Sequence, residues 1–237
     1  MKPIYVALDF PTWQETERFL KENNLRGVPV KVGMELFYRE GVNVIEQLKK
    51  RGHPIFLDLK LHDIPTTVMR AMKNLANLEV DYVNVHALGG SEMMLRAKEG
   101  LQSGSQSQHE TKLLAVTILT SLDEQSMQRD LTLKGTIEDN VIHFAKMAYQ
   151  SGADGVVCSV HESKVIKKHT SIDFITMTPG IRLAVDERDD QKRVATPGYA
   201  REQAVDSIVI GRSITKAVNP EKAYQLALKE WNNGTTS

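Results

Sequence analysis

Residues 54–77 read PIFLDLKLHDIPTTVMRAMKNLAN, and this stretch contains one complete strand–loop–helix unit. The run Pro54–Leu59 is short and mostly apolar, as expected for a strand that is buried on both faces. The stretch Thr66–Asn77 then carries apolar residues at helical spacing. A strand followed directly by a helix is the building unit of α/β folds, so repeats of this unit along the chain would define the fold class.

Similar apolar runs alternate with helical patterns along the whole chain. The expected strands are Ile4–Leu8, Val28–Val32, Pro54–Leu59, Tyr82–Val85, Leu113–Leu119, Gly155–Cys158, Phe174–Met177 and Ser207–Ile210. Near-continuous apolar strands predict a parallel sheet that is covered on both faces. Eight β–α alternations favour a closed (β/α)8 TIM barrel, an α/β fold, that occupies residues 1–237 as a single domain.

The amphipathic stretches between these strands have plausible ends. Thr12 can cap a first helix that runs to about Asn24, with Glu15 completing a capping box. Pro220 lies in the first turn of a last helix that ends near Trp231. Further helices are expected at about Leu36–Lys50, Thr66–Asn77, Ser91–Gln102, Ile137–Gln150 and His161–Lys168.

An open, doubly wound sheet of the Rossmann or flavodoxin type is the alternative fold. A Rossmann domain needs a G-x-G-x-x-G loop at the start of its first helix, where glycines let the backbone approach a dinucleotide. The first turn here reads Asp9-Phe10-Pro11-Thr12, which cannot form that loop. The sequence therefore favours the barrel.

Composition and charge exclude several classes of function. Lysine plus arginine total 30 and aspartate plus glutamate total 30, so no basic excess indicates a nucleic-acid partner. The single cysteine, Cys158, rules out an internal disulfide and is typical of a reducing compartment. The start of the chain runs straight into a strand pattern, and the sequence holds no apolar run of membrane-spanning length. We expect a cytoplasmic enzyme without a membrane partner.

Charged residues gather at the expected carboxyl ends of the strands, where barrel enzymes place their active sites. Asp58 and Lys60 are two positions apart on one strand, so they share a face. Buried charges need partners, and Lys31 and Asp63 can supply them. We expect an alternating Lys–Asp–Lys–Asp array at the barrel mouth; a purely structural salt bridge is the alternative. Other polar residues at strand ends are Asp9, Asn84, His86, Thr117, Thr120, Thr178 and Arg182.

The last strand is followed by Gly211-Arg212, which indicates an anion site. Glycine lets backbone N–H groups approach an anion, and arginine contacts phosphate through two parallel hydrogen bonds. Barrels commonly bind phosphate after strands seven and eight. The segment from Gly180 to Gln191 is long for such a connection and is charged, which is typical of a lid.

The stretch D58-L-K-L-H-D-I-P-T-T-V68 closely resembles the D-x-K-x-x-D-I-P-x-T-V signature of the bacterial orotidine 5'-monophosphate decarboxylases. The resemblance covers nearly the whole chain. Its other parts are Val6–Asp9, Lys31–Gly33, Val85–Ala87 with Gly89-Gly90, Val116–Ser121, Thr178–Arg182, Asp190–Arg193 and Ile210–Arg212. It implies a cofactor-free, metal-free decarboxylase that forms homodimers with shared active sites and converts orotidine 5'-monophosphate to uridine 5'-monophosphate.

The resemblance also implies a role for each matched position. Lys60 is similar to the lysine that protonates C6 of the pyrimidine, and Asp58 to the carboxylate beside the substrate's own carboxylate. Lys31 and Asp63 complete the catalytic set. Asp63, Ile64 and Thr67 resemble the segment inserted into the neighbouring subunit's site, Asp9 and Lys31 the ribose-binding pair, and Thr120 the ring contact. The remaining substrate-binding positions are Pro179, Arg182, Gln191, Gly211 and Arg212, the last four being similar to phosphate and lid contacts.

Two rival functions stay open at this point. The metal-dependent hexulose-phosphate synthases and keto-gulonate-phosphate decarboxylases share D-x-K-x-x-D but place a glutamate on strand two as a magnesium ligand. This chain has Lys31 there, and an ammonium group cannot coordinate a cation. The second rival is a non-catalytic barrel that only binds a phosphorylated metabolite.

Overall fold

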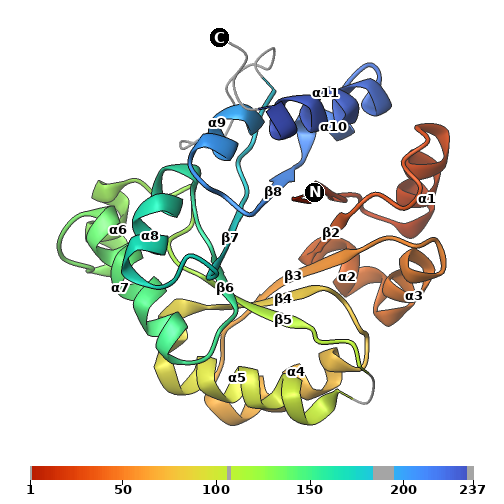
Figure 1. Cartoon of the computed structure of the whole chain (residues 1–237). Helices are drawn as coiled ribbons and strands as arrows, with labels where there is room; N and C mark the ends of the chain where they lie inside the picture. The colour runs from red at the N-terminus through yellow and green to blue at the C-terminus, as the bar shows by residue number, and fades with distance from the viewer. Residues whose placement is uncertain (1, 106–107, 184–194, 234–237) are drawn as a thin grey trace.

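In the computed structural model, eight parallel strands form a closed barrel in which each strand pairs with its neighbours in sequence and β8 pairs with β1 (Figure 1). The structure describes residues 2–105, 108–183 and 195–233. The strands are β1 (Ile4–Ala7), β2 (Val30–Gly33), β3 (Ile55–Leu61), β4 (Tyr82–His86), β5 (Lys112–Val116), β6 (Gly155–Val157), β7 (Ile175–Thr178) and β8 (Ser207–Ile210). Closure of the sheet confirms the barrel and excludes the open doubly wound alternative.

Helices surround the barrel (Figure 1). They are α1 (Trp13–Glu22), α2 (Met34–Glu40), α3 (Val42–Lys50), α4 (Pro65–Ala76), α5 (Gly90–Gly104), α6 (Glu124–Leu131), α7 (Ile137–Gln150), α8 (Ser163–His169), α9 (Pro197–Glu202), α10 (Arg212–Thr215) and α11 (Pro220–Asn233), with 3₁₀ turns η1 (Ala87–Gly89) and η2 (Val160–Glu162). Among the described residues, no helix is long and apolar enough to cross a membrane.

The structure corrects the predicted elements in three places. The helix expected over Leu36–Lys50 is two helices, α2 and α3, because Gly41 lies between them with a φ of 64°. The strand expected to run to Leu119 ends at Val116. The short helices α6, α9 and α10 were not predicted, since each is too short to show a helical period. Thr12 does cap α1, its hydroxyl accepting a hydrogen bond from the N–H of Glu15.

The apolar core has two layers, one outside and one inside the barrel, and their packing determines where a cavity can form. Between the strands and the helices lies a large apolar layer that includes Trp231 and Phe144. Inside the barrel a second cluster fills the floor, with the rings of Tyr5, Phe56 and Tyr82 in edge-to-face contact. Because side chains fill this end, the space for a ligand is left at the carboxyl ends of the strands.

Three aspartates tie neighbouring strands together at the amino-terminal end of the barrel. Each stands just before an even-numbered strand and accepts a backbone N–H from the preceding strand: Asp81 from Ile55, Asp154 from Leu113, and Asp206 from Thr176. Two of these carboxylates also hold a lysine, Asp154 with Lys98 and Asp206 with Lys167. These three aspartates form a structural clamp at the amino-terminal end of the barrel, opposite the carboxyl ends of the strands.

Asp154→Ala is expected to lower the free energy of unfolding by about 2–4 kcal/mol. The substitution leaves the N–H of Leu113 without its hydrogen-bond acceptor. It also removes the closer of two carboxylates, 2.7 Å away, from the largely buried Lys98 ammonium. Urea denaturation at pH 7 measures the change. Asp130→Ala is the control, because it removes an equally close ion pair with Arg129 from the exposed surface. Equal stability of the Asp154 variant and wild type would contradict the clamp.

Candidate active site

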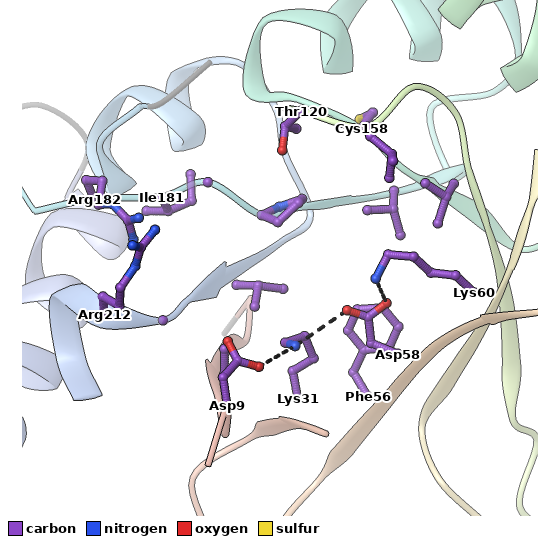
Figure 2. A pocket seen from close by; sticks show the side chains of 18 of the residues that line it. Asp9, Lys31, Phe56, Asp58, Lys60, Thr120, Cys158, Ile181, Arg182 and Arg212 are labelled. Carbon is purple, nitrogen blue, oxygen red and sulfur yellow. Dashed lines mark hydrogen bonds and ion pairs between the residues drawn. The ribbon is translucent and has the colours of Figure 1, made fainter. Parts of the chain in front are cut away.

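A cavity of about 560 Å³ opens at the carboxyl ends of the strands (Figure 2). It brings together most of the residues predicted from the sequence. Those in its wall are Asp9, Lys31, Asp58, Lys60, Thr120, Pro179, Arg182, Gly211 and Arg212. Because they come from β2, β3 and the segments that follow β1, β5, β7 and β8, only closure of the barrel makes them neighbours.

Four charged side chains of alternating sign form a continuous array on one wall (Figure 2). Lys31 Nζ lies 3.0 Å from Asp9 Oδ1 and 3.5 Å from Asp58 Oδ2. Lys60 Nζ lies 2.6 Å from Asp58 Oδ1. Charges about 4 Å apart interact by about 4 kcal/mol at an effective dielectric near 20, so each member depends strongly on its neighbours. The array is therefore electrostatically coupled from Asp9 to Lys60.

The array differs from the predicted one in its second acid. Asp9 takes part, whereas Asp63 lies outside it: its carboxylate accepts a hydrogen bond from the N–H of Ile64 at 2.6 Å. Ile64 is 67% exposed, and Asp63 and Thr67 are exposed as well. The physical reason is that the chain leaves the barrel after Leu61 and turns into α4 at Pro65. Within one chain, these three predicted residues do not line the cavity.

Strand β3 places Asp58 and Lys60 through a local irregularity. The register with β4 shifts between Leu57 and Leu61, as in a β-bulge. Lys60 lies in the left-handed region with a φ of 52°, a conformation that costs a non-glycine residue about 1–3 kcal/mol. Strain of this kind persists only where the surroundings hold it.

The side chain of Asn84 on β4 holds both members of the pair. Its Oδ1 accepts the backbone N–H of Lys60 at 2.7 Å, and its Nδ2 donates to Asp58 Oδ1 at 2.7 Å. Asn84 is 1% exposed, so these hydrogen bonds are shielded from water. The sequence places Asn84 near a strand end but gives no signal for this role, because the bulge that creates it breaks the two-residue period.

The charges of the array set one another's protonation. Burial raises the pKa of Asp58, but the Lys31 and Lys60 ammonium groups outweigh burial and hold that pKa below its ordinary value. Burial lowers the pKa of Lys31, and Asp58 and Asp9 outweigh it in turn and raise that pKa. Both groups are charged at neutral pH. The contribution of Asp58 to stability is present above the ordinary carboxyl pKa and is lost as the pH falls through its lowered pKa.

Two guanidinium groups gather at the other end of the cavity. Figure 2 shows Arg182, from the loop after β7, and Arg212, at the start of α10, pointing toward one another. Each guanidinium group can donate parallel hydrogen bonds to a phosphate, so this end of the cavity suits an anionic group. At Gly211 an added Cβ would lie 3.6 Å from the Cβ of Ala7, an ordinary contact. Packing within the chain therefore does not require glycine there.

Apolar residues that were not predicted form much of the rest of the wall, to which Gly180, Thr215 and Lys216 also contribute. The apolar residues are Ala7, Phe56, Val116, Ile118, Leu119, Val157, Ile181 and Val209. Cys158 lines the cavity too; it follows β6 instead of lying inside the strand, although it is buried as expected. Their signal in the sequence is weak, because an apolar residue at a strand end looks like any other strand residue. Gln191 and most of the proposed lid, residues 184–191, lie outside the described residues.

The two histidines near the mouth stay out of the charged array. His62 and His86 stack with their ring centroids 5.7 Å apart. Burial, together with the neighbouring His62 and Lys60, lowers the pKa of His86, so its ring is neutral at pH 7. Among the described residues, no group of three His, Cys, Asp or Glu side chains is placed to hold a metal ion.

The fold and this site define a (β/α)8-barrel enzyme whose mouth pairs an anion-binding end with a coupled charged array. Residues 2–227 match the model of the Orotidine 5'-phosphate decarboxylase / HUMPS family, and the chain belongs to that family.

Named relatives agree with this assignment. The chain is 57% identical to the orotidine 5'-phosphate decarboxylase of Bacillus pumilus, over 95% of this chain and 97% of that one. It is 53% identical to the enzyme of that name from Listeria innocua, over 98% and 99% of the two chains. A crystal structure of orotidine 5'-phosphate decarboxylase from Lactobacillus acidophilus is similar with a TM-score of 0.88 and 43% identity, covering 98% of this chain and all of that one.

Proposed function

We propose that this protein decarboxylates orotidine 5'-monophosphate to uridine 5'-monophosphate and CO2, the last step of de novo synthesis of that nucleotide, in the cytoplasm. The observation that carries the proposal is the array Asp9–Lys31–Asp58–Lys60, which shares one cavity with Arg182 and Arg212. A phosphate and a reacting carboxylate need cationic groups at both ends of a ligand. Family membership and relatives of that name support the same reaction.

The chemistry follows from the charges. Loss of CO2 leaves an electron pair at C6 of the pyrimidine, which the ring cannot delocalise well. An ammonium group fixed beside C6 stabilises that charge as it develops and then donates its proton. Lys60 fits this role because Asp58 holds its Nζ at 2.6 Å in a largely buried wall. The C6–carboxylate bond breaks, a C6–H bond forms, and Lys60 is reprotonated from solvent.

The other groups bind and orient the nucleotide. Asp9 and Lys31, paired at 3.0 Å, are proposed to contact the ribose, and Thr120 the pyrimidine ring. Gly211 and the two arginines, together with Gln191, are proposed to contact the phosphate, and Pro179 is proposed to contact the substrate from the cavity wall. Binding energy from this remote phosphate can hold the substrate against the charged array.

We also propose a homodimer with shared active sites, built on Asp63, Ile64 and Thr67. These residues are exposed in one chain, and an isoleucine that is 67% exposed gains from burial against a second copy. A partner would bring Asp63 to the array that it does not reach alone. Analytical ultracentrifugation at assay concentrations should give a dimer mass, whereas a fully active monomer would contradict this part of the proposal.

The proposed reaction uses no metal or organic cofactor, so the activity assay is run with and without a metal chelator. Purified protein should release CO2 from orotidine 5'-monophosphate and form uridine 5'-monophosphate at the same rate with excess chelator as without it. A rate that appears only with added Mg²⁺ would favour the metal-dependent branch of the barrel superfamily. Tight binding of the nucleotide without turnover would favour a non-catalytic barrel.

Arg212→Ala is expected to weaken binding of the phosphorylated substrate and to change kcat less. Arginine–phosphate contacts are charge-assisted, so their loss should raise KM by about 10–100-fold, equivalent to about 1.5–3 kcal/mol. Steady-state kinetics measure both constants. Arg201→Ala on α9 is a matched control, because Arg201 is an exposed arginine outside the cavity wall. An unchanged KM in Arg212→Ala would contradict the phosphate assignment.

A further inference from the structure

The bulge in β3 leaves a backbone donor that the sheet ladder does not use. Between Leu57 and Leu61 the register with β4 shifts, and the N–H of Lys60 bonds to the side chain of Asn84 at 2.7 Å. Lys60 also has a φ of 52°. The side chain of Asn84 therefore takes the place of a ladder bond at the residue whose conformation is strained.

The same amide makes a second contact, to the other member of the pair. Asn84 Nδ2 donates to Asp58 Oδ1 at 2.7 Å, and that oxygen also receives the Lys60 ammonium at 2.6 Å. One buried side chain thus binds the backbone of Lys60 and the carboxylate to which the Lys60 ammonium is paired. Since Asn84 is 1% exposed, water does not compete for either contact.

We propose that Asn84 is a positioning residue for the reaction: its side-chain amide fixes the strained backbone of Lys60 and the carboxylate of Asp58 together, and so aims the Lys60 ammonium at C6. The inference rests on the proposed function, in which Lys60 is the proton donor. Asn84 is absent from the residues that line the cavity, so it acts through the pair and not on the substrate.

A neutral carboxamide supplies what this position needs at every pH, whereas a carboxyl group of the same size does so only when it is protonated. The position requires an acceptor for the N–H of Lys60 and a donor for the carboxylate of Asp58. In a carboxamide these two groups are bonded to the same carbon. Leucine has a similar shape but neither group. Aspartate has the acceptor, but when ionised it offers Asp58 no donor and adds a like charge.

Asn84→Leu is expected to lower kcat by about 100-fold while KM stays within about threefold of wild type, because misplacing a reacting group by about 1 Å costs that much and the phosphate contacts are untouched. A kcat within tenfold of wild type would overturn the proposal. So would a crystal structure of the variant in which Lys60 keeps its left-handed backbone and its contact with Asp58.

Asn84→Asp keeps the size of the side chain and gives a second readout. The introduced carboxyl is buried beside Asp58, so its pKa should be raised. Below that pKa it regains a proton that it can donate to Asp58. The ratio of its kcat to that of wild type should therefore rise as the pH falls from about 8 to about 5. A flat ratio would argue against the proposal.

The groups around position 84 act on this pKa in opposite directions: burial and the directly contacting Asp58 raise it, whereas the ammonium groups of Lys60 and Lys31 lower it but are paired with Asp58 and not with the side chain at position 84. Charged neighbours come from β3 and, beyond Asp58, from β2, while β5 presents an apolar residue in register. The facing groups are Asp58, Lys60, Lys31 and Leu114, with Tyr82 and His86 two positions away on β4 itself.

Thr111→Val is the matched control for loss of a buried side-chain hydrogen bond. Thr111 is 6% exposed and donates to the carbonyl of Val80 at the amino-terminal end of the barrel. Its kcat should match that of wild type after correction for folded protein, which thermal unfolding measures. Wild-type protein that fails to turn over the nucleotide would contradict the proposed function, whereas an active wild type with an equally active Asn84→Leu would contradict only this inference.

Discussion

Lys60→Ala is expected to lower kcat for decarboxylation of orotidine 5'-monophosphate by at least about 10⁴-fold, because it removes both the cation that stabilises the C6 electron pair and the proton that quenches it. Each of these effects alone is typically worth about 10²–10⁴ in rate. The substitution also leaves Asp58 without its closest partner, 2.6 Å away, so the remaining carboxylate faces the substrate's own carboxylate with less compensation.

Single-turnover measurements with saturating nucleotide separate this loss of chemistry from a loss of binding. Product binding should survive, since the arginines at the far end of the cavity are unchanged. Lys50→Ala serves as the control, because Lys50 is an exposed lysine at the end of α3. Residual activity within about 100-fold of wild type would remove Lys60 from the role of proton donor.

Asp58→Asn is expected to lower kcat by about 10³-fold. Asp58 stands between two ammonium groups, with Lys31 at 3.5 Å and Lys60 at 2.6 Å. Removing one partner from a buried charge network destabilises the charges that remain by about 3–5 kcal/mol. Asparagine keeps the shape but loses the charge that holds the two lysines together. Lys60 would then lose its fixed position beside C6.

Binding measurements on the same variant distinguish two roles for this carboxylate. If Asp58 positions Lys60, as the short contact between them indicates, the ratio of substrate to product affinity should stay near that of wild type. If Asp58 acts by repelling the substrate's carboxylate, its neutralisation should tighten substrate binding relative to product binding. A relative tightening of more than about tenfold would contradict the positioning role; this factor corresponds to about 1.4 kcal/mol.

Local patterns predict most of the fold. Strands buried on both faces carry apolar residues at nearly every position, so the runs that contain β1 and β8 are visible without knowledge of their partners. The break between α2 and α3 is different. Their apolar pattern continues across Gly41, and only its backbone, with a φ of 64°, shows that the chain changes direction there.

The sequence indicated which residues belong to the site better than it indicated how they contact one another. Asp58 and Lys60 are two positions apart, so the strand period predicts a shared face, and the two side chains do meet although the bulge interrupts that period at Lys60. The partnership of Asp9 with Lys31 joins two strands and depends on the pairing of β1 with β2. Asp63 is close to Lys60 in sequence yet lies outside the array, because the turn into α4 redirects the chain.

The role of Asn84 is the clearest case that sequence reasoning could not reach. A β-bulge has no fixed composition, and the left-handed backbone of Lys60 is unexpected for a lysine. This role depends on the fold, in which an amide on β4 meets a backbone N–H and a carboxylate on β3 at once. Contacts between side chains of different strands do not produce a periodic pattern in the sequence of either strand.

In a crystal structure of the protein with bound uridine 5'-monophosphate, the distance from Lys60 Nζ to C6 of the pyrimidine measures whether Lys60 is placed to donate its proton. We predict a separation of about 3–3.5 Å, the range for groups placed to react, with the phosphate between Arg182 and Arg212. A nucleotide bound in the reverse direction, or a Lys60 Nζ more than about twice that distance from C6, would contradict this role of Lys60.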